Sequence, residues 1–329
     1  MNAGVKVIAA GRHFGCFIFS LGKGVKLHYL KGVRHLVSIQ DLNTATIHEI
    51  VDKALTSKED LPLFNDEKVA LIFLEPSSRT RVSFECAVHD LKAHPILVQE
   101  SGSSLEKNES LKDTLLIFRS MGIRTFVIRC KDKDDLRELT QISGVSIINA
   151  GDGKREHPTQ ALLDLTTLRS LFSWKDLESK ELAIVGDLKS SRVAQSWSYL
   201  APLVGIKLRL ISPTEWKPDS WGQSAAYFDR LEDGLSGADI VMSLRVQKER
   251  HSSAESAVTE RFVRDFQMNE AKLGSKAFLM HPGPTNWGVE LDPALQKYSN
   301  SLILKQVKHG VDLRRAVLSH ILSAQVQGQ

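Results

Sequence analysis

Short apolar runs alternate with longer amphipathic segments through the first half of the chain. The short runs are β-branched or continuously apolar, as in buried parallel strands (residues 69–74, 95–98, 125–128 and 145–148). The amphipathic segments carry apolar residues three and four apart, which is typical of helices (residues 81–91, 110–121 and 133–142). A helix over residues 47–55, capped within residues 43–46, precedes them. This order predicts an open parallel sheet flanked by helices.

The same alternation resumes after a long helical stretch at residues 159–172. Four further strands are expected, followed by a closing helix at residues 306–322 (strands at 182–185, 208–211, 240–243 and 277–280). A length of 329 residues also suits two domains of about 150 each. The predicted fold is therefore α/β, with two domains that are each an open parallel sheet flanked by helices and are linked by helices.

The expected boundaries are an N-terminal extension over residues 1–35, a first domain over 36–165 and a second over 166–329. The C-terminal helix could pack back on the first domain. Residues 1–40 contain six basic side chains and no acidic one, so the net charge of +4 comes from this segment and the remainder is close to neutral. We therefore expect neither a nucleic-acid nor a membrane partner. The extension itself is compatible with a targeting peptide or with a disordered arm.

Three cysteines are too few and too scattered for a disulfide framework. No Cys-x-x-Cys or His-rich spacing offers a zinc site, so no metal is expected. The longest apolar stretch, residues 14–22, is about half of the ~18 residues that a membrane-spanning helix requires. These features predict a protein of a reducing compartment, the cytoplasm.

The segment between the first predicted strand and the next helix is rich in groups that bind anions. Three hydroxyls and two guanidinium groups lie at the helix start, where backbone amides also point outward (Ser77, Ser78, Arg79, Thr80 and Arg81). The alternative is an ordinary Ser/Thr helix cap with surface arginines. The density of donors favours a phosphate-binding turn. Because Gly-x-x-x-x-Gly-Lys is absent, nucleoside triphosphate binding is not implied.

Two more strand ends in the first half carry polar residues. His157 and Gln160 follow a glycine-rich turn and open a helix, where they could polarise a substrate carbonyl, although a capping or packing role is the alternative for His157. Arg129 ends another strand, and taken alone it would be a surface charge. In parallel sheets, ligands bind beyond the carboxyl ends of strands, so we expect these residues to face one crevice.

The second half offers a different set of candidates. The turn that leads to Arg192 lacks Gly-x-Gly-x-x-Gly, so a nicotinamide cofactor is not expected. Arg192 and Arg245 could each bind a carboxylate, and Gln247 would point the same way as Arg245 in an extended segment, unless residues 245–250 are simply a solvated charge run. The rigid loop at Pro282, Gly283 and Pro284 could offer carbonyls to a substrate NH₂.

Five separated motifs occur together and in a fixed order. They are Pro-Ser-Ser-Arg-Thr-Arg, Lys-x-Glu-Ser-Leu-x-Asp-Thr, His-Pro-Thr-Gln, Arg-Val-Gln-Lys-Glu-Arg and His-Pro-Gly-Pro. With them, residues 36–325 resemble the aspartate branch of the aspartate/ornithine carbamoyltransferase superfamily, the aspartate carbamoyltransferase catalytic chains. The Asp-x-x-x-Ser-Met-Gly and His-Cys-Leu-Pro motifs of the ornithine branch are absent.

The resemblance implies a role for each candidate. The anion-binding turn and Arg129 would hold the phosphate of carbamoyl phosphate, while His157, Gln160 and the 282–284 loop would address its carbamoyl group. Arg192, Arg245 and Gln247 would bind the carboxylates of L-aspartate, whose amine attacks the carbamoyl carbon. The resemblance implies that no cofactor is needed, and that the chain serves an early step of pyrimidine biosynthesis. The residues expected to act in catalysis are Arg79, Thr80, Arg129 and His157.

Family members form trimers with sites between subunits, so the resemblance further implies that Ser103 and Lys107 serve the neighbouring subunit's site. A regulatory chain or a dihydroorotase are possible partners. Trp287 departs from the family pattern, which often has Arg there, and the indole could alter loop closure or affinity. Two alternatives stay open, namely a non-catalytic scaffold of the same fold and a carbamoyltransferase for another amino acid.

Overall fold

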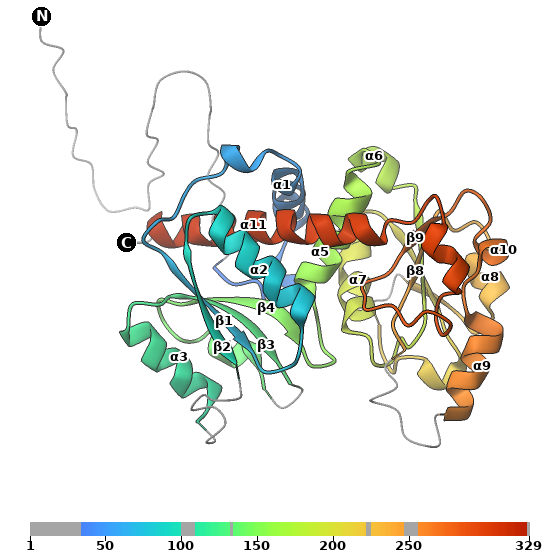
Figure 1. Ribbon diagram of the computed structural model, residues 1–329, viewed down its shortest axis with the longest axis horizontal. Helices are drawn as coiled ribbons and strands as arrows, with labels where there is room; N and C mark the ends of the chain where they lie inside the picture. Colours follow the sequence, from blue (N-terminus) through green and yellow to red (C-terminus); the bar gives the residue numbers. More distant parts are fainter. Residues whose placement is uncertain (1–33, 100–108, 132–133, 222–224, 247–255, 328–329) are drawn as a thin grey trace, which may run out of the picture. The chain divides into compact units, whose positions relative to one another are not determined.

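The computed structural model describes residues 34–99, 109–131, 134–221, 225–246 and 256–327. The first half of the described chain builds a four-stranded parallel sheet with the strand order β2-β1-β3-β4 (Figure 1). Its strands are β1 (Lys68–Phe73), β2 (His94–Gln99), β3 (Thr125–Cys130) and β4 (Ser146–Asp152). The helices that connect them are α2 (Ser78–Asp90), α3 (Leu111–Ser120) and α4 (Leu136–Leu139).

The second half builds a five-stranded parallel sheet with the order β7-β6-β5-β8-β9. Its strands are β5 (Glu181–Val185), β6 (Lys207–Ile211), β7 (Ala225–Phe228), β8 (Ile240–Ser243) and β9 (Phe278–Met280). Its helices are α7 (Arg192–Leu203), α8 (Leu231–Leu235), α9 (Ser256–Phe266) and α10 (Glu270–Leu273). The predicted fold class, two open parallel sheets flanked by helices, is confirmed.

Helices α1 (Thr44–Ala54), α5 (Pro158–Arg169), α6 (Trp174–Leu177) and α11 (Ile303–Gln327) complete the fold. Every residue of α5 from Pro158 to Leu168 is buried, so this helix is enclosed on all sides. Helix α11, the last of the chain, packs against α1, α2 and α5 (Figure 1). Near its end, Gln325 Nε2 donates to the Arg124 carbonyl at 3.0 Å and to Ser146 Oγ at 2.7 Å. The end of α11 is thereby fastened to the first sheet.

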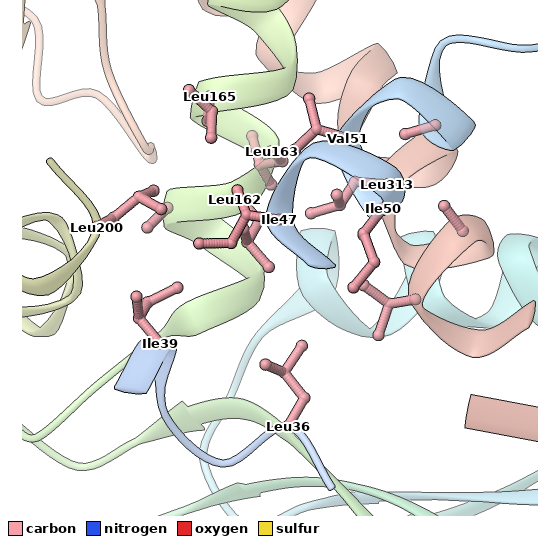
Figure 2. Packing of buried hydrophobic residues seen from close by; sticks show 14 of the residues in the cluster. Leu36, Ile39, Ile47, Ile50, Val51, Leu162, Leu163, Leu165, Leu200 and Leu313 are labelled. Atoms are coloured by element: carbon pink, nitrogen blue, oxygen red, sulfur yellow. The ribbon is translucent and has the colours of Figure 1, made fainter. Parts of the chain in front are cut away.

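One hydrophobic core runs through both halves of the described chain. Leu36, Ile39 and Ile47 from the N-terminal side pack with Leu162 of α5 and Leu200 of α7 (Figure 2). The same cluster extends to strands of both sheets, including Leu71 of β1 and Ile184 of β5. The two sheets are therefore joined by continuous apolar packing, which fixes the carboxyl ends of their strands with respect to each other.

Several expected elements differ in extent. The helix expected over residues 133–142 is a single turn, α4, which ends before the β-branched Thr140 and Ile142. The helix expected over 159–172 ends at Arg169, and α6 follows it. The apolar run at residues 95–98 predicts a buried strand, but β2 lies at the sheet edge with Leu97 47% exposed. The sequence pattern does not predict the short edge strand β7. No helix within the described ranges has the length and apolar character needed to cross a bilayer.

Candidate functional site

The anion-binding turn joins β1 to α2, as its sequence predicts. Ser77 is the N-cap residue of α2, but its hydroxyl makes no capping hydrogen bond, so it does not occupy the amides of the first turn. Thr80 is buried in that turn, whereas Ser78 and Arg79 are exposed and Arg81 is half-buried. The turn therefore presents hydroxyl, guanidinium and backbone N–H donors at one end of the helix.

The guanidinium of Arg79 lies directly over Gly283, in the loop that follows β9. A Cβ atom on Gly283 would stand 2.8 Å from Arg79 Cζ, and its φ of +67° is a backbone conformation that favours glycine. Desolvation, and then the positive charge of Arg245, lower the pKa of Arg79. Arg245 follows β8 and is half-buried. The turn before α2, Arg245 just beyond β8 and the 282–284 loop therefore meet at one place.

Arg129 and Arg192 meet in the same way over Gly151. A Cβ atom there would lie 3.0 Å from Arg192 Cζ and 3.2 Å from Arg129 Nη1. Between them stands Glu75, whose Oε2 is 3.4 Å from Arg129 Nε and 3.1 Å from Arg192 Nη1. Arg192 Nη1 also donates to the carbonyl of Gly153 at 3.0 Å. One carboxylate thus orients two guanidinium groups that come from β3 and from the first residue of α7.

His157 is buried at the N-terminus of α5. Its backbone N–H donates to Ser196 Oγ at 3.0 Å, which ties the start of α5 to α7. Burial, followed by the positive charges of Arg192, Arg129 and Arg314, holds the pKa of His157 well below its ordinary range. The imidazole is therefore neutral near pH ~7 and can donate one hydrogen bond without carrying a charge.

Gln160 lies in the first turn of α5 and is 8% exposed. Its Nε2 donates to Asp164 Oδ1 at 2.9 Å. The amide therefore has a fixed partner within the helix that carries His157.

The 282–284 loop is held from beneath by His281. The Gly283 N–H donates to His281 Nδ1 at 2.8 Å, and His281 Nε2 lies 3.2 Å from Glu290 Oε1 with both side chains fully buried. Because Nδ1 accepts, Nε2 carries the proton that reaches Glu290. Pro282 and Pro284 flank Gly283, and the Gly283–Pro284 peptide bond is cis. These hydrogen bonds to His281 hold the loop against the guanidinium of Arg79.

The structure brings together most of the predicted residues and leaves some outside. Arg79, Arg129, His157, Arg192 and Arg245 are linked by contacts or mutual electrostatic effects. Gln247, Ser103 and Lys107 lie outside the described residues. Trp287 is 37% exposed and bridges to Leu291 in the backbone, and nothing in the described chain gives its indole a role in the site.

Two site residues were missed from the sequence, Glu75 and Asp164. Glu75 stands two residues before Ser77, at the start of the anion-binding turn, and this proximity in sequence is the signal that could have suggested it. Asp164 is four residues after Gln160, one helical turn along the same face, which is the corresponding signal for a side-chain contact. In the described ranges no three His, Cys, Asp or Glu side chains are grouped as metal ligands.

Four guanidinium groups from four elements, with one neutral imidazole, make a strongly cationic site. Such a site suits a phosphate together with a second anionic substrate, because arginine forks bind phosphate and carboxylate oxygens in pairs. Neutral donors aimed at a carbonyl also stabilise the oxyanion that forms during attack on it. The arrangement can therefore support acyl-type transfer from a phosphate leaving group.

Two family models together cover most of the chain. Residues 34–170 match "Aspartate/ornithine carbamoyltransferase, carbamoyl-P binding domain", and residues 178–321 match "Aspartate/ornithine carbamoyltransferase, Asp/Orn binding domain". The first match ends close to the end of α5, and the second begins just before β5.

Similar proteins carry matching names. The aspartate carbamoyltransferase catalytic subunit of Thermus aquaticus is 40% identical over 300 residues, which is 88% of this chain and 98% of that protein. The corresponding subunit of Sorangium cellulosum is 40% identical over 297 residues, 87% of this chain and 92% of that protein.

Solved structures show the same fold. The aspartate transcarbamoylase of Trypanosoma cruzi, in complex with carbamoyl aspartate and phosphate, has a TM-score of 0.77 at 25% identity and covers 88% of this chain and 96% of its own. The catalytic subunit of M. jannaschii aspartate transcarbamoylase has a TM-score of 0.76 at 30% identity, with 88% and 98% covered.

Proposed function

The chain belongs to the aspartate/ornithine carbamoyltransferase family, and we propose that its cluster of arginines is the site of carbamoyl transfer. The reaction moves the carbamoyl group of carbamoyl phosphate onto the amine of L-aspartate and gives N-carbamoyl-L-aspartate and phosphate. The observation that carries the site assignment is the convergence of Arg79, Arg129, Arg192 and Arg245 around His157 and Gly283. N-carbamoyl-L-aspartate, the product of this reaction, is used in pyrimidine biosynthesis.

The phosphate of carbamoyl phosphate is assigned to the turn before α2. Ser77, Ser78, Thr80 and Arg81 would supply hydroxyl, amide and guanidinium donors there, and Arg79 would lie between this turn and the 282–284 loop. Arg129 would add a charge from the end of β3. The absence of a capping side-chain bond at Ser77 supports this assignment, since those donors then remain for a ligand.

The carbamoyl group is assigned to His157, Gln160 and the loop of Pro282, Gly283 and Pro284. The neutral His157 would donate to the carbamoyl oxygen, while carbonyl oxygens of the loop would accept from its NH₂. As the aspartate amine attacks, the new C–N bond forms, the C–O bond to phosphate breaks, and the amine proton leaves with the departing phosphate. Arg79, Thr80 and His157 would stabilise the intermediate oxyanion.

The two carboxylates of L-aspartate are assigned to Arg192, Arg245 and Gln247. In the structure, the Arg192 guanidinium is already oriented by Glu75 and by the Gly153 carbonyl. This orientation would lower the cost of ordering a long side chain when the substrate binds. We assign carbamoyl phosphate to a first domain over residues 36–165 and aspartate to a second over 166–329.

We further propose a homotrimer in the cytoplasm, with Ser103 and Lys107 completing a neighbouring site. Large apolar side chains are exposed on β2, on α3 and directly after α3, which supports an interface there (Leu97, Leu116, Ile117 and Met121). The thiols of Cys86 and Cys130 are free, which suits a reducing compartment.

A mixing experiment tests whether sites are shared between subunits. Mixing Lys107→Ala chains with Arg79→Ala chains should restore part of the activity if sites are shared. No activity in verified mixed trimers would contradict shared sites.

The main test is formation of N-carbamoyl-L-aspartate by the purified chain, measured with labelled carbamoyl phosphate. We expect product with wild type and a loss of about a thousandfold with Arg79→Ala. No product from wild type at saturating substrates would instead support a non-catalytic scaffold. A panel of amino acids in which ornithine outperforms aspartate would support a carbamoyltransferase for another acceptor.

A further inference from the structure

The side chain of Asp164 is fully buried and joins three helices. Its Oδ1 accepts from Gln160 Nε2 at 2.9 Å on α5 and from Gln306 Nε2 at 2.8 Å on α11. Its Oδ2 accepts from Trp197 Nε1 at 3.2 Å on α7. Helix α7 begins at Arg192, so this carboxylate is bonded to the helix of one substrate arginine and to the side chain of Gln160.

The chemistry of Asp164 decides which way the Gln160 amide faces. An ionised carboxylate can only accept hydrogen bonds, so Gln160 must turn its NH₂ toward Asp164. The carbonyl Oε1 is then the atom left for another partner. Within the described ranges Oε1 accepts no hydrogen bond. Gln160 therefore offers an acceptor, and a ligand group that matches it must carry an N–H or O–H.

Asp164 fixes the orientation of the Gln306 amide in the same way. Its Nε2 donates to Asp164 Oδ1, and its Oε1 accepts from the backbone N–H of His281 at 2.9 Å. Because Nε2 must face the carboxylate, Oε1 must face His281, the residue that begins the 282–284 loop. The Asp164 carboxylate thus determines the orientation of both amides. Gln160 is left with a free acceptor, and Gln306 holds the start of the 282–284 loop, whose carbonyls are the other acceptors in the site.

We infer that Asp164 is a positioning residue that makes the site selective for an acyl phosphate bearing an NH₂ group, by holding Gln160 and, through Gln306, the 282–284 loop as hydrogen-bond acceptors. The inference rests on the proposed function. Acetyl phosphate is the matching probe, because a CH₃ replaces the NH₂ and leaves the two acceptors without a donor. A purely structural Asp164 would affect the binding of both acyl phosphates to the same degree.

The experiment compares the dissociation constants of carbamoyl phosphate and acetyl phosphate in wild type and D164N. Binding is measured at about pH 8, above the pKa of about 7 that burial gives Asp164. In D164N the asparagine NH₂ opposes one of the three donors, so the Gln160 amide can reverse and present its own NH₂ to the ligand. The control is T167V on the same buried helix, which removes a hydroxyl that donates to the Leu163 carbonyl within α5 and lies 3.1 Å from His309 Nδ1 on α11.

Wild type should prefer carbamoyl phosphate, and D164N should reduce that preference by about tenfold, through weaker carbamoyl phosphate binding. T167V should keep the wild-type ratio. Equal weakening of both ligands in D164N, or an unchanged ratio, would overturn the inference. If D164N does not fold, Q306M decides in its place: a fall of about threefold in the ratio supports the inference, and an unchanged ratio overturns it. A wild type that forms no N-carbamoyl-L-aspartate would overturn the proposed function and this inference with it.

Discussion

Glu75 Oε2 lies 3.1 Å from Nη1 of Arg192, so the segment that follows β1 is bonded to the first residue of α7. These two residues come from the two halves of the chain, 117 positions apart. The same oxygen is 3.4 Å from Arg129 Nε. Glu75 therefore supplies the negative charge that allows two guanidinium groups to lie near one glycine, and it links the phosphate side of the site to the aspartate side.

Replacing Glu75 with Gln should reduce kcat/KM for aspartate by about tenfold to a hundredfold. The amide keeps the size of the side chain but removes the charge that orients Arg192 and Arg129. Steady-state kinetics with varied aspartate would measure this. Glu181→Gln is the matched control, because Glu181 pairs with Arg209 and Lys207 away from the site, and it should leave kcat/KM unchanged. An equal loss in both variants would contradict a specific role for Glu75.

Gly283→Ala should lower kcat/KM for carbamoyl phosphate by about a hundredfold, because its Cβ would collide with the Arg79 guanidinium at 2.8 Å. Gly283 also has a positive φ, so backbone strain must be separated from the collision. Gly288→Ala does this, since Gly288 has a φ of +85° with nothing within 4 Å of the added Cβ. The control should be less stable and yet active. Kinetics together with thermal unfolding would show whether the two effects separate as expected.

His157→Asn should lower kcat by about a hundredfold without moving the acid limb of the pH profile. Burial and three arginines hold the pKa of His157 far below its usual value, so the imidazole stays neutral over the whole working range. Its contribution is then a hydrogen bond and not a titrating proton. Profiles of kcat against pH for both proteins should therefore have the same shape. A shift of the acid limb in the variant would show that His157 titrates in the enzyme.

The free energy of unfolding should depend on pH through Asp164. Burial raises the pKa of Asp164 from 3.8 to about 7, so between these values the unfolded chain loses a proton that the folded chain keeps. Stability attributable to this group therefore falls as pH rises through that window, by about 1.4 kcal/mol per pH unit at most, and levels off above pH ~7.

Urea unfolding of wild type and D164N across this window would measure the effect, and the variant should show the shallower fall. Asp176→Asn is the control. Hydrogen bonds from Ser173 lower the pKa of Asp176, so this carboxyl is ionised in both states above pH ~5, and its removal should leave the slope between pH ~5 and pH ~7 unchanged. The same slope in wild type and D164N would show that Asp164 titrates normally.

Much of the fold was predictable, because strands and their flanking helices are encoded by local apolar periodicity. The donors of the turn before α2 were also predictable from local sequence. They are contiguous and stand between a strand and a helix. Strand β7 was missed because four residues at a sheet edge, all at least partly exposed, leave little apolar signal. The apolar spacing also overstated the length of α4, which ends before the β-branched Thr140 and Ile142.

The missed site residues have partners that are distant in sequence. Glu75 acts through Arg192, and Asp164 through Gln306, which is 142 positions away. Taken alone, an acid before a proline or inside a helix has many possible roles, and only the folded chain shows which donors surround it. The arginines of the site could therefore be identified from the sequence, whereas the residues that pair with distant partners could not.

The packing of α11 against α2 bears on how the protein is made. Arg315 Nη1 on α11 lies 3.2 Å from Asp90 Oδ2 at the end of α2, and Val317 and Leu318 belong to the same core cluster as Phe84 of α2. Yet α11 is synthesised more than two hundred residues after α2. During translation, the apolar side of α2 is therefore not yet covered by α11. The part of the N-terminal core that packs against α11 is therefore completed only after α11 has been synthesised.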